Sequence, residues 1–141
     1  MRTVVLLALA ACGSSHPVVR WNSTGIGVNE RIEIKSSGDG SYLSTNNGLR
    51  EREERVVLSE AQVQELDELF RSHGACQLKH DPAYQPAPDE GKATLELSFP
   101  DQTCKIELWN LEWARGPAQS IAETMKSMRP LRPPPPGRVM Q

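Results

Sequence analysis

The sequence predicts an α+β fold, an antiparallel sheet of about four to six strands with two helices packed on one face. Three observations lead to this prediction. Apolar and polar residues alternate in two regions, within residues 18–58 and 94–108, as they do in half-buried strands. A segment with apolar residues at helical spacing follows each of these regions. Residues that favour turns, chiefly glycine, asparagine and aspartate, separate the segments at short intervals.

The first region is expected to form strands joined by tight turns. Ile32 and Ile34 lie on one face of a strictly alternating segment, and charged neighbours lie on the other. A run of mixed charges, 50–55, is expected to be a solvated edge strand or a loop, because charges on an edge discourage pairing with other sheets. The expected strands are 18–23, 31–35 and 42–45, and the expected turns are 24–27, 37–40 and 46–48.

A helix is expected directly after the first region. Ser59 and Gln62 form a capping-box pattern at its start, and Gly74 is a natural end. A long loop with three prolines, 79–91, leads to a hairpin and then to a second helix with Pro117 in its first turn. The helix faces expected in the core are Val63, Leu66, Leu69 and Phe70, and then Ile121, Met125 and Met128; the hairpin strands contain 94–99 and 106–108.

Length, charge and motifs limit the classes of function. The 141 residues suffice for one domain with a modest core. A formal net charge of −2 offers no basic surface, so we expect no nucleic-acid partner. Neither a Gly-x-Ser-x-Gly elbow nor a His-Glu-x-x-His helix occurs. Carboxylates at Asp81, Asp89 and Glu90 are an alternative hydrolytic centre, but loop carboxylates are usually only solvated, and we expect neither an enzyme nor a cofactor.

The amino terminus has the pattern of a secretory signal. One cation, Arg2, precedes eight apolar residues, Val4–Ala11, a run too short to span a bilayer; a buried core helix is the alternative. Leu9-Ala10-Ala11-Cys12 resembles the bacterial lipobox, in which small residues precede an obligatory cysteine. The resemblance implies cleavage before Cys12 and acylation of Cys12, and hence a lipoprotein of the cell envelope. Gly13, in place of Asp, resembles the default for sorting to the outer membrane, where the protein would face the periplasm or the exterior.

These features divide the chain into four segments. We expect a lipoprotein signal peptide at 1–11, a lipidated tether at 12–17, a single α+β domain at 18–129 and a proline-rich disordered tail at 130–141. The four consecutive prolines of the tail favour polyproline II or disorder. Binding of the tail to an aromatic groove is the alternative to a plain disordered end.

The three cysteines agree with export. If Cys12 carries lipid, Cys76 and Cys104 remain as an even pair in an oxidising compartment, and we expect a disulfide between them; two buried free thiols are the alternative. Cys76 also lies between His73 and His80, next to Asp81, at a spacing found among zinc ligands. Because a disulfide at Cys76 excludes that site, we expect no metal. If a metal does bind, His73 and His80 are the candidate ligands.

Two tryptophans are candidates for a partner-binding surface. In the alternating pattern Trp109 falls on the face opposite Ile106 and Leu108, either exposed to solvent or beneath the charged segment. Trp113 follows closely, and exposed aromatic residues often mark binding surfaces. The alternative is a second small hydrophobic cluster.

A weaker family resemblance covers the body of the chain, from about Val18 to Met128. An opening strand is followed by Ser23-Thr24-Gly25-Ile26-Gly27, then by the Asp39-Gly40 turn, a helix start at Leu58-Ser59, and a late hairpin leading to a proline-started helix. This order resembles emfourin-like domains, small bacterial proteins that inhibit thermolysin-like metalloproteases. The family typically has Ser-Gly-Gly-Phe-Ala-Gly at the first site, where this chain has Thr24 for the first glycine and Ile26 for the aromatic residue. The resemblance implies that residues 23–27 contact a partner.

The function expected from these observations is that of a lipid-anchored binding or structural module of the cell envelope. Its partners would be the membrane, through lipid on Cys12, and an unidentified envelope protein or secreted protease. Inhibition of thermolysin-type metalloproteases and metal binding are the alternatives.

Overall fold

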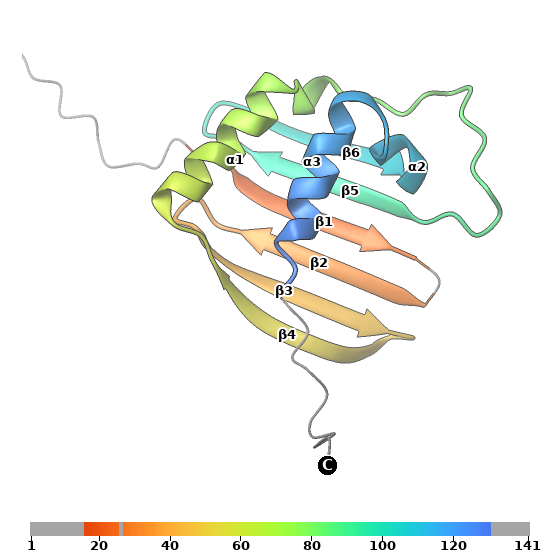
Figure 1. Ribbon diagram of the computed structural model, residues 1–141, viewed down its shortest axis with the longest axis horizontal. Helices are drawn as coiled ribbons and strands as arrows, with labels where there is room; N and C mark the ends of the chain where they lie inside the picture. Colours follow the sequence, from red (N-terminus) through yellow and green to blue (C-terminus); the bar gives the residue numbers. More distant parts are fainter. Residues whose placement is uncertain (1–15, 26, 131–141) are drawn as a thin grey trace, which may run out of the picture.

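In the part of the chain that the structure describes, six antiparallel strands form one sheet in the order β4-β3-β2-β1-β5-β6, accompanied by three α-helices and one short 3₁₀ helix (Figure 1). The computed structural model describes residues 16–25 and 27–130. The predicted α+β class is confirmed, with six strands and with one more α-helix than expected. The elements are β1 Val18–Thr24, β2 Val28–Ile34, β3 Asp39–Asn46, β4 Leu49–Val57, α1 Glu60–Ser72, η1 Ala75–Gln77, β5 Lys92–Ser98, β6 Thr103–Trp109, α2 Asn110–Trp113 and α3 Gly116–Ser127.

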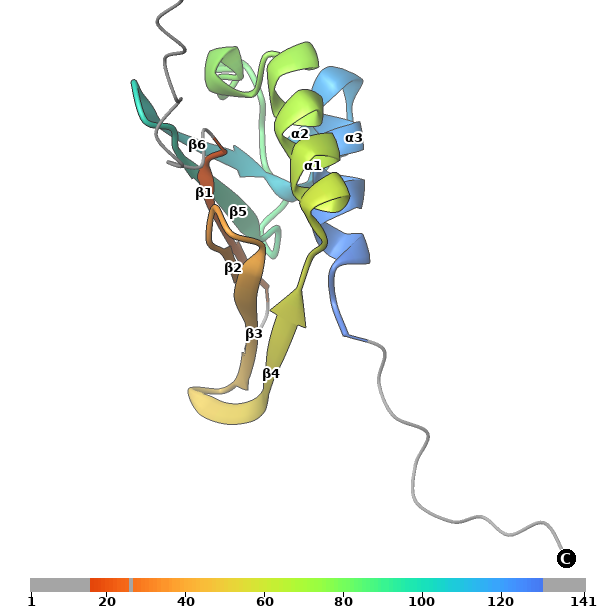
Figure 2. The same cartoon turned by 90° about the vertical axis from the view of Figure 1, so that its left-hand side faces the viewer.

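The core lies between the sheet and the helices. Figure 2 shows α1 and α3 on the same side of the sheet, which we call the helix face; no described helix lies on the other side, the open face. One cross-strand row of buried side chains crosses five strands on the helix face: Ile106, Leu95, Trp21, Ile32 and Tyr42. Helices α1 and α3 add Leu66, Phe70, Ile121 and Met125 to the same core cluster. Each large side chain buried in this way contributes about 1.5–3 kcal/mol to folding.

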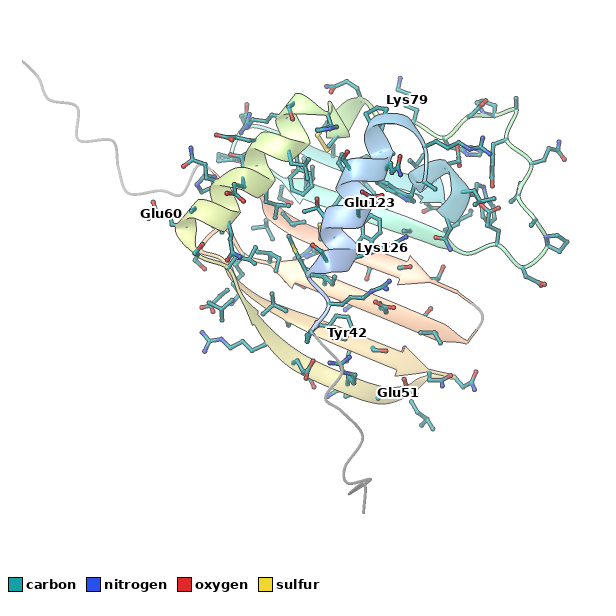
Figure 3. The ribbon with its side chains drawn as sticks, viewed as in Figure 1. Tyr42, Glu51, Glu60, Lys79, Glu123 and Lys126 are labelled. Carbon is teal, nitrogen blue, oxygen red and sulfur yellow. A yellow bond between two sulfur atoms is a disulfide. The ribbon has the colours of Figure 1, made fainter. Side chains whose placement is uncertain are left out.

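The helices start where the sequence predicts. The Ser59 hydroxyl accepts a hydrogen bond from the Gln62 backbone N–H at 3.2 Å, and the Gln62 side chain accepts one from the Ser59 N–H at 2.8 Å. This capping box satisfies backbone donors that the first helical turn leaves unpaired, next to Glu60 (Figure 3). Gly74 ends the α1 region with φ +59°, in the left-handed region, and Pro117 lies in the first turn of α3.

The charged run forms the edge strand β4, one of the two structures expected for it. Its cations pair locally: Arg50 with Glu53 at 2.6 Å, and Arg55 with Asp39 of β3 at 2.6 Å. On the helix face, Tyr42 lies near the end of α3 (Figure 3), where the Arg52 guanidinium stacks 5.5 Å from the centre of its ring. Burial and the nearby charge of Glu30 raise the pKa of Tyr42. This part of the helix face is therefore closed by polar groups.

The two ends of the sheet differ in what they carry. At one end, which we call the tether end after the tether expected at 12–17, the chain enters β1 through His16 and Pro17. Pro17 is buried, and His16 Nδ1 lies 3.1 Å from Asp67 Oδ2 of α1. At the distal end lie the β1–β2 connection, the β3–β4 turn and the start of β5 (Figure 1). Because a strand rises about 3.3 Å per residue, β1 carries the chain roughly 20 Å from one end to the other.

Several sequence-based expectations concern residues outside the described ranges. They are the signal peptide 1–11, Cys12 with the tether as far as residue 15, Ile26, and the tail from residue 131 onward. Among the helices of the described part, none is both long enough and apolar enough to cross a membrane.

Candidate functional site

The β1–β2 connection lies at the distal end, and the neighbouring turn holds it in place. The Gly25 N–H donates to the Val28 carbonyl at 2.9 Å, and the Asn47 N–H of the β3–β4 turn donates to the Gly27 carbonyl at 2.6 Å. Gly27 has φ +70°, which favours glycine. Both described glycines of the connection are exposed. A loop fixed by such bonds loses less conformational freedom when a partner binds than a free loop does.

A shallow hollow of about 370 Å³ opens beside this connection. It lies on the open face, where strand register places residues of β1, β2 and β3 side by side. Hydroxyl and carboxamide groups predominate in the lining, and the half-buried Leu43 supplies apolar surface. The lining residues are Asn22, Ser23, Thr24, Asn29, Glu30, Arg31, Leu43 and Thr45. Ser23 and Thr24, two of the residues implied by the emfourin resemblance, thus border the hollow.

Arg31 is the cation of this hollow, and its position is set by its neighbours across the sheet. It lies between Asn22 of β1 and Leu43 of β3 in the strand register. Its Nε donates to Asn22 Oδ1 at 3.0 Å. This bond uses the Nε–H and leaves the terminal nitrogens of the guanidinium without a carboxylate partner among the described residues.

The loop 79–91 borders the hollow through Thr24. The Thr24 hydroxyl donates to the Lys92 carbonyl at 3.2 Å and accepts from the Lys92 N–H at 3.4 Å. Gly91 packs so closely on Thr24 that a Cβ at position 91 would collide with the Thr24 carbonyl oxygen. The end of the long loop is therefore joined to the wall of the hollow.

Two carboxylates hold the long loop against α2. Glu112 accepts from His80 Nδ1 at 2.7 Å, from the Asp81 N–H at 2.9 Å and from the Trp109 N–H at 3.1 Å. Glu90 accepts from the Tyr84 hydroxyl at 2.5 and 2.7 Å and from the Leu111 N–H at 3.3 Å.

These bonds shift the ionisation of the groups involved. Burial by itself raises the pKa of Glu112, but the hydrogen bonds from Asp81, His80 and Trp109 outweigh it, and the net pKa is lowered. The pKa of Glu90 is lowered in the same way, by Tyr84 and by backbone N–H groups against the effect of burial. Burial and the hydrogen bond to Glu90 raise the pKa of Tyr84 to about 12. The ionised carboxylates are therefore the forms that hold the loop.

The two candidate tryptophans have different environments. Trp109 is half-buried on the open face, and the Lys92 amino group lies 4.3 Å from the centre of one of its rings. The expectation that Trp113 belongs to a binding surface is wrong, because only 1% of this residue is exposed. Its indole N–H donates to the Ala93 carbonyl at 2.9 Å, and its ring packs on Trp21. Trp113 belongs to the main core, so neither a partner surface nor a separate small cluster describes it.

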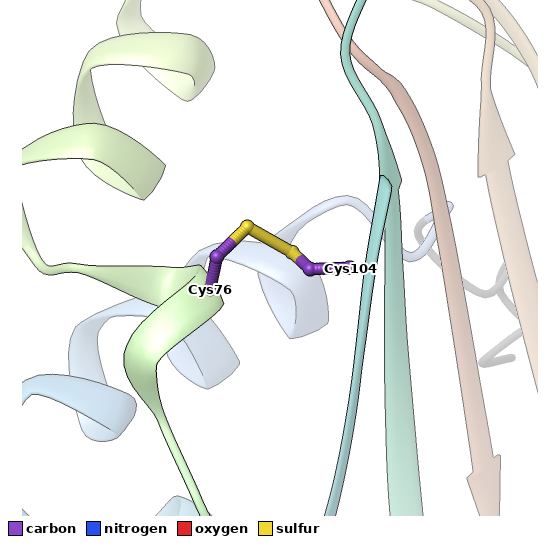
Figure 4. Close-up of a disulfide and its surroundings, with 2 residues drawn as sticks. All are labelled: Cys76 and Cys104. Carbon is purple, nitrogen blue, oxygen red and sulfur yellow. A yellow bond between two sulfur atoms is a disulfide. The ribbon is translucent and has the colours of Figure 1, made fainter. Parts of the chain in front are cut away.

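The expected disulfide is present: Cys76 of η1 is bonded to Cys104 of β6 (Figure 4). This bond removes Cys76 as a thiolate ligand for a metal. The other two candidate ligands point to separate partners, His73 to the Leu69 carbonyl at 3.1 Å and His80 to Glu112. Over residues 16–25 and 27–130, no three His, Cys, Asp or Glu side chains are grouped so that they could hold a metal ion.

The sequence alone does not single out Asn22, Arg31 or Leu43. Its alternating pattern places Arg31 on the face opposite Ile32, which is the one available signal. Which side chains flank Arg31 depends on strand order and register, and a single strand pattern contains neither.

Comparison with known proteins adds no family assignment. No protein-family model matches the chain, and no curated protein sequence matches it.

Proposed function

We propose that the protein is a lipid-anchored module of the cell envelope that binds a protein partner through the distal end of its sheet. The observation that carries this proposal is the direction of β1, which begins beside the tether and ends in the exposed, hydrogen-bonded connection at the hollow. Three residues lie between Cys12 and His16, so the backbone that carries the lipid would lie within about 14 Å of His16. The hollow would then lie at the opposite end of β1 from the membrane.

This separation allows the two interactions to occur together. Two or three acyl chains on Cys12 would anchor the protein durably, because each buried CH₂ contributes about 0.8 kcal/mol. The distal connection and the hollow would remain accessible to a partner in the compartment that the domain faces. The hydrogen bond of Gly27 to Asn47 supports a pre-organised binding surface.

Replacing Cys12 with Ser tests the anchor. We expect the variant to lose the mass of the acyl chains and to leave the membrane fraction, with Ser15→Ala as the matched control that changes neither. The anchor proposal fails if Cys12→Ser leaves both the mass and the membrane association as they were.

Site-specific cross-linking in cells tests the binding end. A photoreactive residue at Asn29 or Asn47 of the distal end should give a discrete cross-linked product with an envelope protein. The same residue at Ser37 or Gln102, both exposed turn positions of the tether end, should not. Equal products from the two ends would contradict a distal binding surface.

A second candidate function is inhibition of thermolysin-type metalloproteases. The observation that favours it is the hydrogen bonding of the exposed residues Gly25 and Gly27 on either side of Ile26, because a rigid loop can occupy a protease cleft at little entropic cost. Full-length protein with Cys12→Ser should then inhibit such an enzyme at micromolar concentration, and the double substitution Thr24→Ala, Gly25→Ala should weaken inhibition. Ser37→Ala at the tether end is the control. Absence of inhibition, or inhibition that survives the double substitution, would exclude this function.

A further inference from the structure

The open face of the sheet carries charges in rows, and one row is balanced. Across four strands the row reads Lys105, Glu96, Arg20 and Glu33, with alternating sign. Nitrogen–oxygen distances of 3.8, 3.8 and 3.6 Å join each neighbouring pair. Opposite charges that face each other across strands stabilise a sheet and leave little net field at its surface. The charges of this row are balanced by one another, so the row does not indicate a ligand.

The adjacent row, nearer the distal end, is different. Its members from β6 to β4 are Glu107, Thr94, Asn22, Arg31, Leu43 and Glu53. Arg31 has a carboxamide on one side and an apolar side chain on the other, so neither immediate neighbour balances its charge.

The acids around Arg31 are paired with other cations. Glu53 pairs with Arg50 at 2.6 Å, and Glu33 pairs with Arg20 at 3.6 Å. Glu30 precedes Arg31 in β2, so its carboxylate lies on the helix face, where it pairs with Arg129. Among the described residues Arg31 thus forms no ion pair, and the acids nearest to it on the open face, Glu33 and Glu53, are paired with other cations.

The guanidinium is also oriented. The Arg31 Nε–H donates to Asn22 Oδ1 at 3.0 Å, and this bond orients the plane of the guanidinium. Leu43 lies beside Arg31 in the strand register. A planar guanidinium presents paired N–H donors at the spacing of the two oxygens of a carboxylate. Carboxamide and hydroxyl groups of Asn29 and Thr45 line the same hollow and can bond further polar atoms of a ligand.

We infer that this hollow is a carboxylate-binding site, in which Arg31, oriented by Asn22, binds an acidic side chain of the protein partner. The inference rests on the proposed function for the nature of the partner and deepens it by stating the chemistry of the contact. Carboxylate binding in the hollow is itself independent of whether Cys12 carries lipid, so the two can fail separately.

The test is an NMR titration of the full-length protein with Cys12→Ser. The probes are acetyl-Gly-Glu-Gly-amide, its neutral counterpart acetyl-Gly-Gln-Gly-amide, and inorganic phosphate. The glutamate peptide should give saturable shifts of the amide signals of residues 22–24, 29–31 and 43–45 and of the Arg31 Nε signal. The glutamine peptide should give no saturable shift.

Variants identify the group responsible. Arg31→Gln should weaken binding of the glutamate peptide about tenfold or more, because it removes hydrogen bonds to a charged group. Arg31→Lys, which keeps the charge but not the paired donors, should weaken binding less. The matched control is Arg55→Gln, which removes a cation that Asp39 already binds, and it should leave the affinity unchanged.

Three results with the two peptides would overturn the inference. They are the absence of saturable shifts with the glutamate peptide, equal binding of the glutamine peptide, and full binding by a folded Arg31→Gln variant. Tighter binding of phosphate than of the glutamate peptide would also overturn it, because it would assign a phosphate site instead. If Cys12→Ser leaves the membrane and the peptide binds, both proposals are supported. If Cys12→Ser stays at the membrane and the peptide binds, only the anchor proposal fails.

Discussion

Trp113 packs edge-on against Trp21, with ring centroids 4.9 Å apart and an angle of 69° between the ring planes. Trp21 lies in β1, one of the two middle strands, and Trp113 is the last residue of the short helix α2, so this pair joins α2 to the middle of the sheet. Both side chains are 1% exposed. Edge-to-face pairs of this kind add about 0.5–1.5 kcal/mol beyond the burial of the rings.

Shortening Trp113 should destabilise the whole domain. Trp113→Phe removes the indole N–H that bonds the Ala93 carbonyl, a net loss of about 0.5–1.5 kcal/mol, and it also removes part of a fully buried ring, which leaves a void in the core. Urea unfolding followed by circular dichroism measures the loss. Trp109→Phe is the control, since Trp109 is half-buried on the open face, and an equal loss in the two variants would contradict the placement of Trp113 in the core.

Removal of the disulfide should lower stability without changing the fold. The bonded cysteines are 28 residues apart, and a cross-link closing a loop of that length stabilises by about 3–4 kcal/mol, chiefly by restricting the unfolded chain. The free energy of unfolding of Cys76→Ala, Cys104→Ala, compared with that of the parent, measures the effect. Titration of thiols in the folded parent protein is the companion assay, and two reactive thiols from these positions would refute the bond.

The long loop should detach from α2 in acid. The pKa values of Glu90 and Glu112 are lowered in the folded protein, so their contribution is complete above the unfolded glutamate value of about 4.3. The contribution is lost as the pH falls through the lowered folded values. Amide-exchange protection of residues 80–91, corrected for intrinsic rates, should fall in this range before the protection of β1 does.

A variant separates this effect from general acid unfolding. Glu112→Gln removes the charge that binds His80 and the Asp81 N–H, so it should reduce protection of the loop even near neutral pH. Glu123→Gln, on the exposed surface of α3, is the matched control. Simultaneous loss of protection in the loop and in β1 would show that Glu112 has no local role.

A methyl group at position 91 should disturb the hollow, because position 91 is distant from Thr24 in the sequence but adjacent to it in the structure. Gly91→Ala would collide with the Thr24 carbonyl oxygen, so the loop must move away from β1. We expect changed amide shifts for Thr24 and Asn22 and a reduced free energy of unfolding. Gly48→Ala is the control for steric crowding, since no atom lies within 4 Å of a Cβ built there, although its positive φ adds some strain. Unchanged shifts at Thr24 in Gly91→Ala would contradict the close contact.

The elements that the sequence predicts well are those with local signals. Alternation at Ile32 and Ile34 marks a strand, and the Ser59–Gln62 pattern marks the start of α1, because each signal acts within one turn or one strand. The helix α2 was not expected: its four residues are too few for a periodic pattern, and tertiary bonds through Glu112 and Trp113 hold it.

The candidate site was predictable only in part. The glycines and hydroxyl residues at 23–27 indicate a special connection from the sequence alone. The hollow depends on the pairing of β1 with β2 and of β2 with β3, and its border depends on the pairing of β1 with β5, which joins residues more than 60 positions apart. The charge of Arg31 is left unbalanced only because of that register. Trp113 is buried only because α2 packs on the sheet.

The central position of β1 also determines how the domain would bear mechanical load. The chain enters β1 at Val18, and β1 is paired along its length with β2 on one side and with β5 on the other. A pull on the tether acts along the strand, so the bonds of both ladders are loaded in shear and must break together rather than one after another. Had the tether led into an edge strand, the same force could peel that strand away singly. If the protein is anchored and bound as proposed, this arrangement would keep the domain folded when its partner and its point of attachment are drawn apart.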